Sequence, residues 1–250
     1  MKKQTFVLFI ATIALACSVQ AQPGRMSGPK FNGAIAKLFG DNTAFSADLE
    51  IHVAGEQDVT MPGKMAFDSG KSRFEMNLSD AKGSHMPPNV AERMKAMGMD
   101  QTVVISRPDA KVSYLVYPGL NAYAETPLQD SDAGKPDSAF KMETTELGKE
   151  TLDGHACVKN KVIITDDEGK PHESTVWNAS DLKKFPIKIE MNENGNATTM
   201  LFKNVKTSKP DAALFEPPQS YKKYDNQMSL MQQEMMKRMG GGGGMPPGHQ

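Results

Sequence analysis

The chain has 250 residues and a formal net charge of −1, from 29 basic and 30 acidic side chains. Nucleic-acid-binding proteins present a basic patch, so this balance disfavours that class of function. The length suits one large β domain or two small ones, and the lack of an internal linker favours one domain.

The first 21 residues have the pattern of a secretory signal peptide. Lys2 and Lys3 precede an apolar run over residues 6–16, and small residues before position 22 offer a cleavage site. Cleavage after Ala21 removes two of the 29 basic residues and no acidic one, which leaves 27 against 30 and a net charge of −3. The run is too short to span a membrane, so we predict no transmembrane segment after cleavage. The predicted location is the periplasm.

One alternative for the N-terminus stays open. Residues 14–17 resemble a bacterial lipoprotein box, which would leave a lipid-anchored Cys17 at the start of the mature chain. Residues 22–30 are rich in Gly, Pro and Ser, and we expect a flexible leader there. We place the folded domain at residues 31–224.

The first half of this domain alternates between helical and strand patterns. Residues 31–39 carry apolar side chains at helical spacing, and residues 45–53 then alternate apolar and polar positions without an error, as a half-buried strand does. Further strands are predicted around residues 65–67, 74–78, 102–106 and 111–117. Residues 87–98 predict a second short helix with Val90, Met94 and Met97 on one face. Residues 127–138 are polar and predict a loop.

The second half predicts a run of hairpins. Between residues 147 and 224, short apolar-alternating segments are separated by turn residues such as those at 166–169 and 192–195. Consecutive hairpins give an antiparallel meander, because parallel pairs need long crossover connections. The predicted fold class is therefore mainly β: a curved antiparallel sheet.

The order of these elements resembles the LolA/LolB/LppX superfamily of bacterial lipoprotein and lipid carriers, and within it a periplasmic branch with a Met-rich C-terminus and a domain of unknown function. The resemblance spans residues 34–224. The motifs that carry it are Asp109-Ala-Lys111, Tyr117-Pro118, Gly148-Lys-Glu150, Gly154-His155, Trp177, Pro186-Ile-Lys188 and residues 211–218. It implies a half-open barrel with a few short helices on its concave side and acyl chains held between sheet and helices.

The predicted function is accordingly a non-enzymatic periplasmic binding protein or carrier for a lipid, an acyl chain or another apolar ligand. The ligand is expected on the concave face, closed by the helices at residues 31–39 and 90–97. The apolar residues predicted to line this cavity are Phe45, Leu49, Ile51, Phe74, Met76, Val90, Met94, Met97, Ile187, Ile189 and Phe202. Methionine side chains, including Met99, suit such a surface because they are flexible and apolar.

The C-terminal tail, residues 225–250, is rich in Met and Gly and supports a second hypothesis. We expect a Met-faced helix that is mobile or docks on an apolar groove, and a fold that survives without it. Thioethers are soft ligands suited to Cu(I), so the alternative function is periplasmic copper handling. Its candidate ligands are Met228, Met231, Met235, Met236 and Met239. A third hypothesis is a module that binds another envelope protein.

The remaining polar residues indicate no catalytic centre and no cofactor. The five histidines are scattered, and no pair has the spacing of metal ligands. Residues 166–168 resemble a Ca²⁺ loop only in part and are interpreted as a turn. Cys157 is the one cysteine of the mature chain; Lys159 and Lys161 could depress its pKa, although an inert free thiol is the simpler interpretation.

Overall fold

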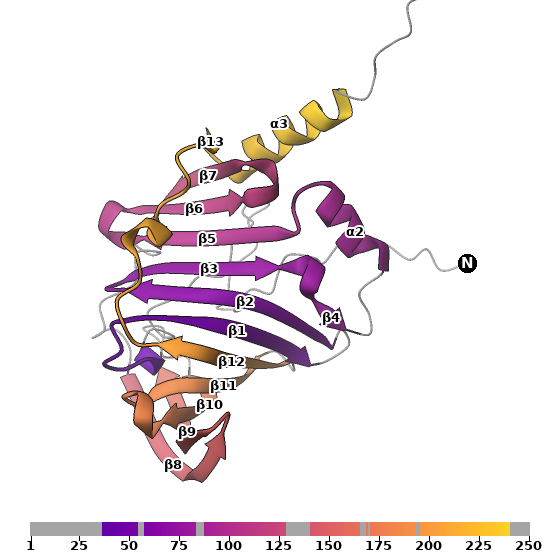
Figure 1. Cartoon of the computed structure of the whole chain (residues 1–250). Coiled ribbons are helices and arrows are strands. Elements are labelled where there is room, and N and C mark those ends of the chain that lie inside the picture. The colour runs from indigo at the N-terminus through magenta and orange to yellow at the C-terminus, as the bar shows by residue number, and fades with distance from the viewer. Residues whose placement is uncertain are drawn as a thin grey trace, which may run out of the picture.

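Figure 1 shows a computed structural model in which one long sheet curls along its width. The structure describes residues 37–54, 58–83, 88–128, 141–165, 169, 171–193 and 196–240. The strands are β1 (Ala44–Ala54), β2 (Val59–Asp68), β3 (Lys71–Asn77), β4 (Lys82–Gly83), β5 (Gln101–Arg107), β6 (Val112–Tyr117), β7 (Ala122–Pro127), β8 (Lys141–Leu152), β9 (His155–Thr165), β10 (Pro171–Ala179), β11 (Phe185–Glu193), β12 (Asn196–Lys206) and β13 (Lys222–Tyr224). Two α-helices are described, α2 (Pro88–Ala96) and α3 (Gln227–Gly240).

The sheet consists of two meanders that are joined at its middle. Its order is β13-β7-β6-β5-β3-β2-β1-β12-β11-β10-β9-β8, with β4 paired to β2. Strands β1 and β12 pair antiparallel and connect the N-terminal half of the sheet to the C-terminal half. The predicted mainly β, curved and open sheet is confirmed, and the hairpins β9–β10 and β11–β12 lie where the turn residues predicted them.

One strand pair of this mostly antiparallel sheet is parallel. Strand β13 pairs parallel to β7, so the sheet is mixed. The physical reason is the path of the chain after β12. The chain crosses the outer face of the sheet and ends beside β7, at the edge of the N-terminal half (Figure 1). Such a long crossing supplies the connection that a parallel neighbour requires.

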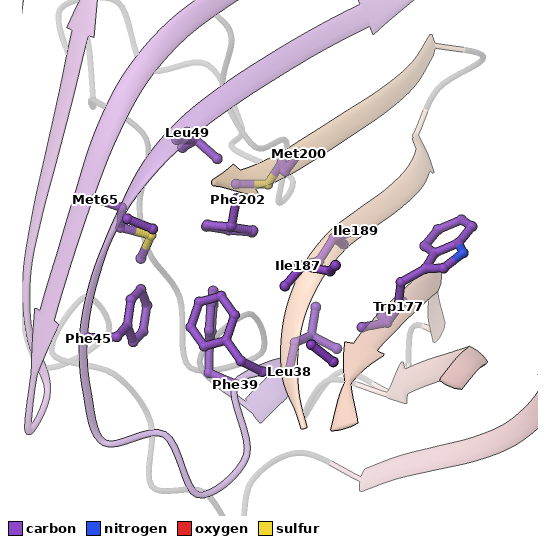
Figure 2. Packing of buried hydrophobic residues seen from close by; sticks show 14 of the residues in the cluster. Leu38, Phe39, Phe45, Leu49, Met65, Trp177, Ile187, Ile189, Met200 and Phe202 are labelled. Carbon is purple, nitrogen blue, oxygen red and sulfur yellow. The ribbon is translucent and has the colours of Figure 1, made fainter. Parts of the chain in front are cut away.

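The inner face of the curl carries the main hydrophobic core. Alternate residues of β1 point inward, and Phe45, Leu49 and Ile51 are each at most 2% exposed. Figure 2 shows Phe45 and Leu49 facing side chains of β11 and β12, with Leu38 and Phe39 lying between the two groups, and Ile51 belongs to the same core cluster. Packing of this kind removes apolar surface from water on both sides of the curl and holds the halves together.

The outer face has a smaller core of its own. The crossing segment carries a short 3₁₀ helix, η6 (Ala212–Phe215), and Phe215 is 1% exposed there. It packs with buried residues of β2, β5 and β6, namely Ala66, Val103, Ile105 and Val116. Nη1 of Arg73 donates to the carbonyl of Leu214 at 3.0 Å, which fixes η6 against β3. Phe215 therefore covers the outer face of β6 at Val116.

The helices are arranged differently from the prediction. Helix α2 lies beyond the ends of β3 and β5 (Figure 1), next to the 3₁₀ turn η1 (Leu78–Asp80), so it does not close the concave face. It links β4, which pairs with β2, to β5, which pairs with β3, and so has to run past the ends of those strands. Of the helix predicted at residues 31–39, Leu38 and Phe39 lie in the inner core, and residues 31–36 are outside the described residues.

Several other predictions also fall outside the described residues. They are the signal peptide, Cys17 and the leader at residues 1–30, the loop at 129–138, the turn at 166–168 and the final residues 241–250. Within the described part of the chain, no helix is long and apolar enough to cross a membrane.

Candidate functional site

Six of the predicted cavity residues pack against one another on the closed half of the inner face. Phe45, Leu49, Ile51, Ile187, Ile189 and Phe202 are each 0–2% exposed. The Phe45 ring lies 4.7 Å from that of Phe39 and 4.9 Å from that of Phe185, between ring centroids. Aromatic pairs at these distances fill the space between β1 and β11 with protein atoms. These six side chains are core residues.

The other half of the inner face is less covered. Strand register places Phe74 of β3 opposite Met65 of β2, Val104 of β5 opposite Phe74, and Leu115 of β6 opposite Val104. Directly opposed residues of antiparallel strands point to the same face, so these side chains continue the inner face. We define the inner strip as Phe67, Phe74, Met76, Val104 and Leu115, all of which are half-buried. Two of them, Phe74 and Met76, were predicted to contact the ligand.

A pocket of about 110 Å³ opens at one end of this strip, where helix α3 meets the turn after α2. Its lining consists of Met97, Met99, Leu120, Met231, Glu234, Met235 and Arg238. Met97 and Met99 come from the α2–β5 turn, Leu120 ends the 3₁₀ turn η3 (Pro118–Leu120), and the other four belong to α3. We call this the methionine pocket.

A glycine allows the two turns to approach each other beside the pocket. Gly98 has φ of +67°, and a Cβ at this position would lie 2.5 Å from the carbonyl oxygen of Gly119. Any side chain would therefore separate the turn after α2 from η3. The approach aligns the carbonyls of Ala96 and Gly119, and the guanidinium of Arg238 donates to both, at 2.7 and 3.4 Å.

Helix α3 is bound to the sheet through its apolar side. Leu230 is 0% exposed and packs with Tyr117, Ala122, Ala124 and Tyr224, while Met99, Leu115, Leu120 and Met231 surround this cluster. The side chain of Asn226 accepts a hydrogen bond from the Ser229 amide at 2.8 Å and caps the helix. The first part of the predicted tail is thus docked on the inner side of β6 and β7. Of the two possibilities considered from the sequence, a mobile helix or a docked one, the structure shows the docked one.

The carboxylate of Glu234 links this helix to β13. Glu234 is 9% exposed and accepts hydrogen bonds from the Tyr224 hydroxyl and from Nζ of Lys237. Burial raises the pKa of the Glu234 carboxyl, but the hydrogen bonds from Lys237 and Tyr224 and the charges of Lys237 and Lys222 outweigh it, so the pKa lies below its ordinary value of 4.5. Because the pKa of Glu234 is lower in the folded than in the unfolded state, its ionised carboxylate stabilises the docked helix at pH values above the unfolded pKa. This contribution is lost as the pH falls through the folded pKa.

We therefore expect α3 to loosen in acid before the rest of the sheet does. Hydrogen-exchange protection of the α3 amides should be constant from pH 7 down to about the ordinary glutamate pKa and should fall below it. Protection of β10 and β11 should persist over the same range. The control is Glu234→Gln, which removes the titrating group and should flatten the profile of α3. A Gln variant with the wild-type acid profile would contradict this role of Glu234.

The remaining methionines of the copper hypothesis lie in two settings. Met228 and Met236 are 65% and 64% exposed on α3, whereas Met231 and Met235 line the pocket; the side chain of Met239 is outside what the structure describes. Of the residues in and just after α2 that were predicted to contact the ligand, Met94 is half-buried and Met97 lines the methionine pocket, while the Val90 side chain is outside the described set.

Two of the described histidines have carboxylate partners, and the cysteine is buried. His52 lies 2.7 Å from Asp58 and His155 lies 2.7 Å from Asp181, where the hydrogen bond from His155 lowers the pKa of the aspartate. Cys157 is 3% exposed, and burial raises the pKa of its thiol, so an activated thiolate is not favoured there. In the residues that the structure describes, no three His, Cys, Asp or Glu side chains form a metal-binding group.

A scan against protein families matches residues 45–185, more than half of the chain, to a domain of unknown function, DUF4412. The chain belongs to the DUF4412 family. No match to the DUF4412 chain is found among curated proteins.

Solved structures similar to the DUF4412 chain share little sequence with it. An uncharacterized conserved protein from Thermus thermophilus is 11% identical, with a TM-score of 0.46, over 76% of this chain and 96% of that one. LprF from Mycobacterium bovis is 14% identical, with a TM-score of 0.41, over 76% and 94%. A LolA superfamily protein from Nitrosomonas europaea is 8% identical, with a TM-score of 0.37, over 73% and 94%. A LolA superfamily protein is thus among the similar solved structures, as the sequence resemblance led us to expect, but identities and TM-scores this low establish neither a superfamily nor a ligand.

Sequence reasoning missed several residues of the candidate site in this DUF4412 chain. Val104 and Leu115 belong to the inner strip and were not selected, although both lie on predicted strands and alternation could have assigned their face. Leu120 and Leu230 could not be found in that way. Their roles come from the docking of α3 on β6 and β7, a contact between segments about 110 residues apart that local periodicity does not record.

Proposed function

We propose that the protein is a non-enzymatic binding protein or carrier of the bacterial cell envelope that holds an acyl chain or similar apolar ligand along the inner strip. The signal-peptide pattern at residues 1–21 supports a periplasmic location. The ligand assignment rests on the structure of the sheet itself.

One observation carries this proposal. On the β1 and β11–β12 half of the same inner face, the six core residues are 0–2% exposed, yet the apolar residues of the inner strip remain half-buried. A contiguous apolar surface that is left partly accessible is typical of an interaction site. The strip crosses four neighbouring strands and ends beside the methionine pocket, so it has the elongated form that suits a chain.

The strip also has suitable chemistry. Its side chains, which include one methionine and two phenylalanines, carry no charge, and an acyl chain gains about 0.8 kcal/mol for each methylene that is buried. Methionine adapts to ligands of different shape, which suits a carrier of mixed lipids. The packed half would then act as the rigid support, and the six core residues, which the sequence predicted to line the cavity, would support the site without touching the ligand.

The test is binding and displacement of a fluorescent fatty acid. We expect wild-type protein to bind the probe and the variants Phe74→Asp and Val104→Asp to bind it at least about tenfold more weakly, because a carboxylate beside an apolar chain costs at least about 1–3 kcal/mol. Gln101→Asp is the matched control, since Gln101 lies on β5 with Val104 and is exposed. Phe74→Leu should retain binding. Absence of probe binding by the wild type, or equal binding by the Val104→Asp and Gln101→Asp variants, would overturn the proposal.

A further inference from the structure

Four methionines from two distant parts of the chain line one pocket. Met97 and Met99 flank Gly98 in the turn after α2, and Met231 and Met235 lie four residues apart on α3. Residues at that spacing share a face of a helix, so both thioethers of α3 are directed to the same side. The docking of α3 through Leu230 is what brings the two pairs together.

Apolar packing accounts for only part of this composition, since Met99 and Met231 pack against the Leu230 cluster. Met235 lines the pocket and yet is 48% exposed, and Met228 and Met236 of the same helix are still more exposed. Exposed methionines contribute little to packing, and Leu120 is the one aliphatic residue among the seven that line the pocket. Thioether sulfur is a soft ligand that selects Cu(I) over the harder divalent ions.

The charges around the pocket favour a monovalent ion. The Glu234 carboxylate is already paired with Lys237, 2.5 Å away, and bonded to Tyr224. The Arg238 guanidinium is held by the carbonyls of Ala96 and Gly119 and leaves one positive charge at the rim. Electrostatic repulsion scales with the charge of the ion, so a divalent cation is disfavoured twice as strongly as a monovalent one.

We propose that Met97, Met99, Met231 and Met235 form a binding site for Cu(I). The site extends the copper hypothesis from the helix to the body of the protein, since half of its ligands come from the α2 turn. It is independent of the carrier function, because none of the four residues belongs to the inner strip. Binding would connect α3 to the α2 turn and so stabilise the docked helix by linkage.

The experiment titrates full-length protein with Cu(I) under a reducing atmosphere against a chromophoric Cu(I) chelator. Ag(I), a monovalent soft ion that does not change its redox state, gives the stoichiometry by native mass spectrometry. We expect one ion per chain, an increase in melting temperature, and greater hydrogen-exchange protection of α3. Zn²⁺ at the same concentration should produce none of these effects.

Methionine-to-leucine variants separate coordination from packing, because leucine keeps the volume and the apolar character and removes the sulfur. Losing a residue that only orients a metal ligand weakens a site by about 10- to 100-fold, so we expect Met97→Leu and Met231→Leu to weaken Cu(I) binding at least tenfold. Met228→Leu and Met236→Leu are the controls on the same helix and should bind as the wild type does. Circular dichroism confirms that each variant is folded.

Three results would overturn the proposal: no Cu(I) uptake by the wild type, unchanged affinity in the Met97→Leu and Met231→Leu variants, or equal losses in the Met228→Leu and Met236→Leu controls. Unchanged affinity for the fatty-acid probe in all four variants would show that binding of an apolar ligand does not depend on the Cu(I) site. If the Met97→Leu and Met231→Leu variants lose probe binding but bind Cu(I) normally, the pocket is an apolar subsite and not a copper site.

Discussion

Replacing Phe45 with alanine is expected to lower the free energy of unfolding by about 3–5 kcal/mol, the range for truncating a buried phenylalanine. The ring is 0% exposed and stacks on Phe39, with Phe67 and Phe185 as further neighbours within 5.7 Å. These partners come from β2, β11 and the turn before β1, so the cavity would open where the two halves of the curl meet. Collapse around the cavity is hindered because each neighbour is fixed by its own strand or turn.

Urea denaturation followed by the fluorescence of Trp177 measures this effect, since Trp177 is 3% exposed in the same core. The control is Leu147→Ala on β8, where the leucine is 54% exposed and truncation should change stability by no more than about 0.5 kcal/mol. Comparable losses for the two variants would mean that the inner core does not hold the halves of the sheet together.

The second large effect is expected at Leu230. Leu230→Ala should cost about 2 kcal/mol or more, near the lower end of the range for buried leucines, because a helix at the edge of a sheet can shift to reduce the cavity. Deleting residues 227–250 should cost at least as much, since it also exposes Tyr117, Ala122 and Ala124. This expectation replaces the sequence-based one, in which the fold survives without the tail at nearly unchanged stability.

Chemical denaturation and hydrogen exchange of β6 and β7 test the role of Leu230. Ser229→Ala provides a control one residue away on the same helix, at a position where Asn226 still caps the backbone. A deletion variant with the wild-type melting temperature and unchanged protection of β7 would restore the view that α3 is an accessory to the fold.

The strands could be predicted because each one is a local pattern. Phe45, Leu49 and Ile51 alternate with polar residues, and β1 spans that segment. Hairpin turns at residues 166–169 and 192–195 predicted the neighbours of β9 to β12 in the right order. Residues 211–218 were recognised only as a motif, since nothing periodic in them indicates that Phe215 covers the outer face.

The difference between core and site could not be predicted from those patterns. Phe45 and Phe74 have the same alternating context, and both point to the inner face. Only the packing of Phe39 and of β11 over Phe45 makes one a core residue, while Phe74 stays half-buried. The methionine pocket is a further case, because Met97 and Met231 meet through a helix whose docking depends on tertiary contacts.

The pairing of β1 with β12 has a consequence for biogenesis. Glu50 on the first strand lies opposite Leu201 on the twelfth, so the central seam of the sheet joins the start of the domain to its end. A growing chain exposes the hydrogen-bonding edge and apolar face of β1 until nearly the whole domain has been synthesised, and contacts of such sequence separation form slowly. An unpaired edge of this kind is a template for aggregation, so the nascent protein depends on whatever shields that strand until β12 has been synthesised.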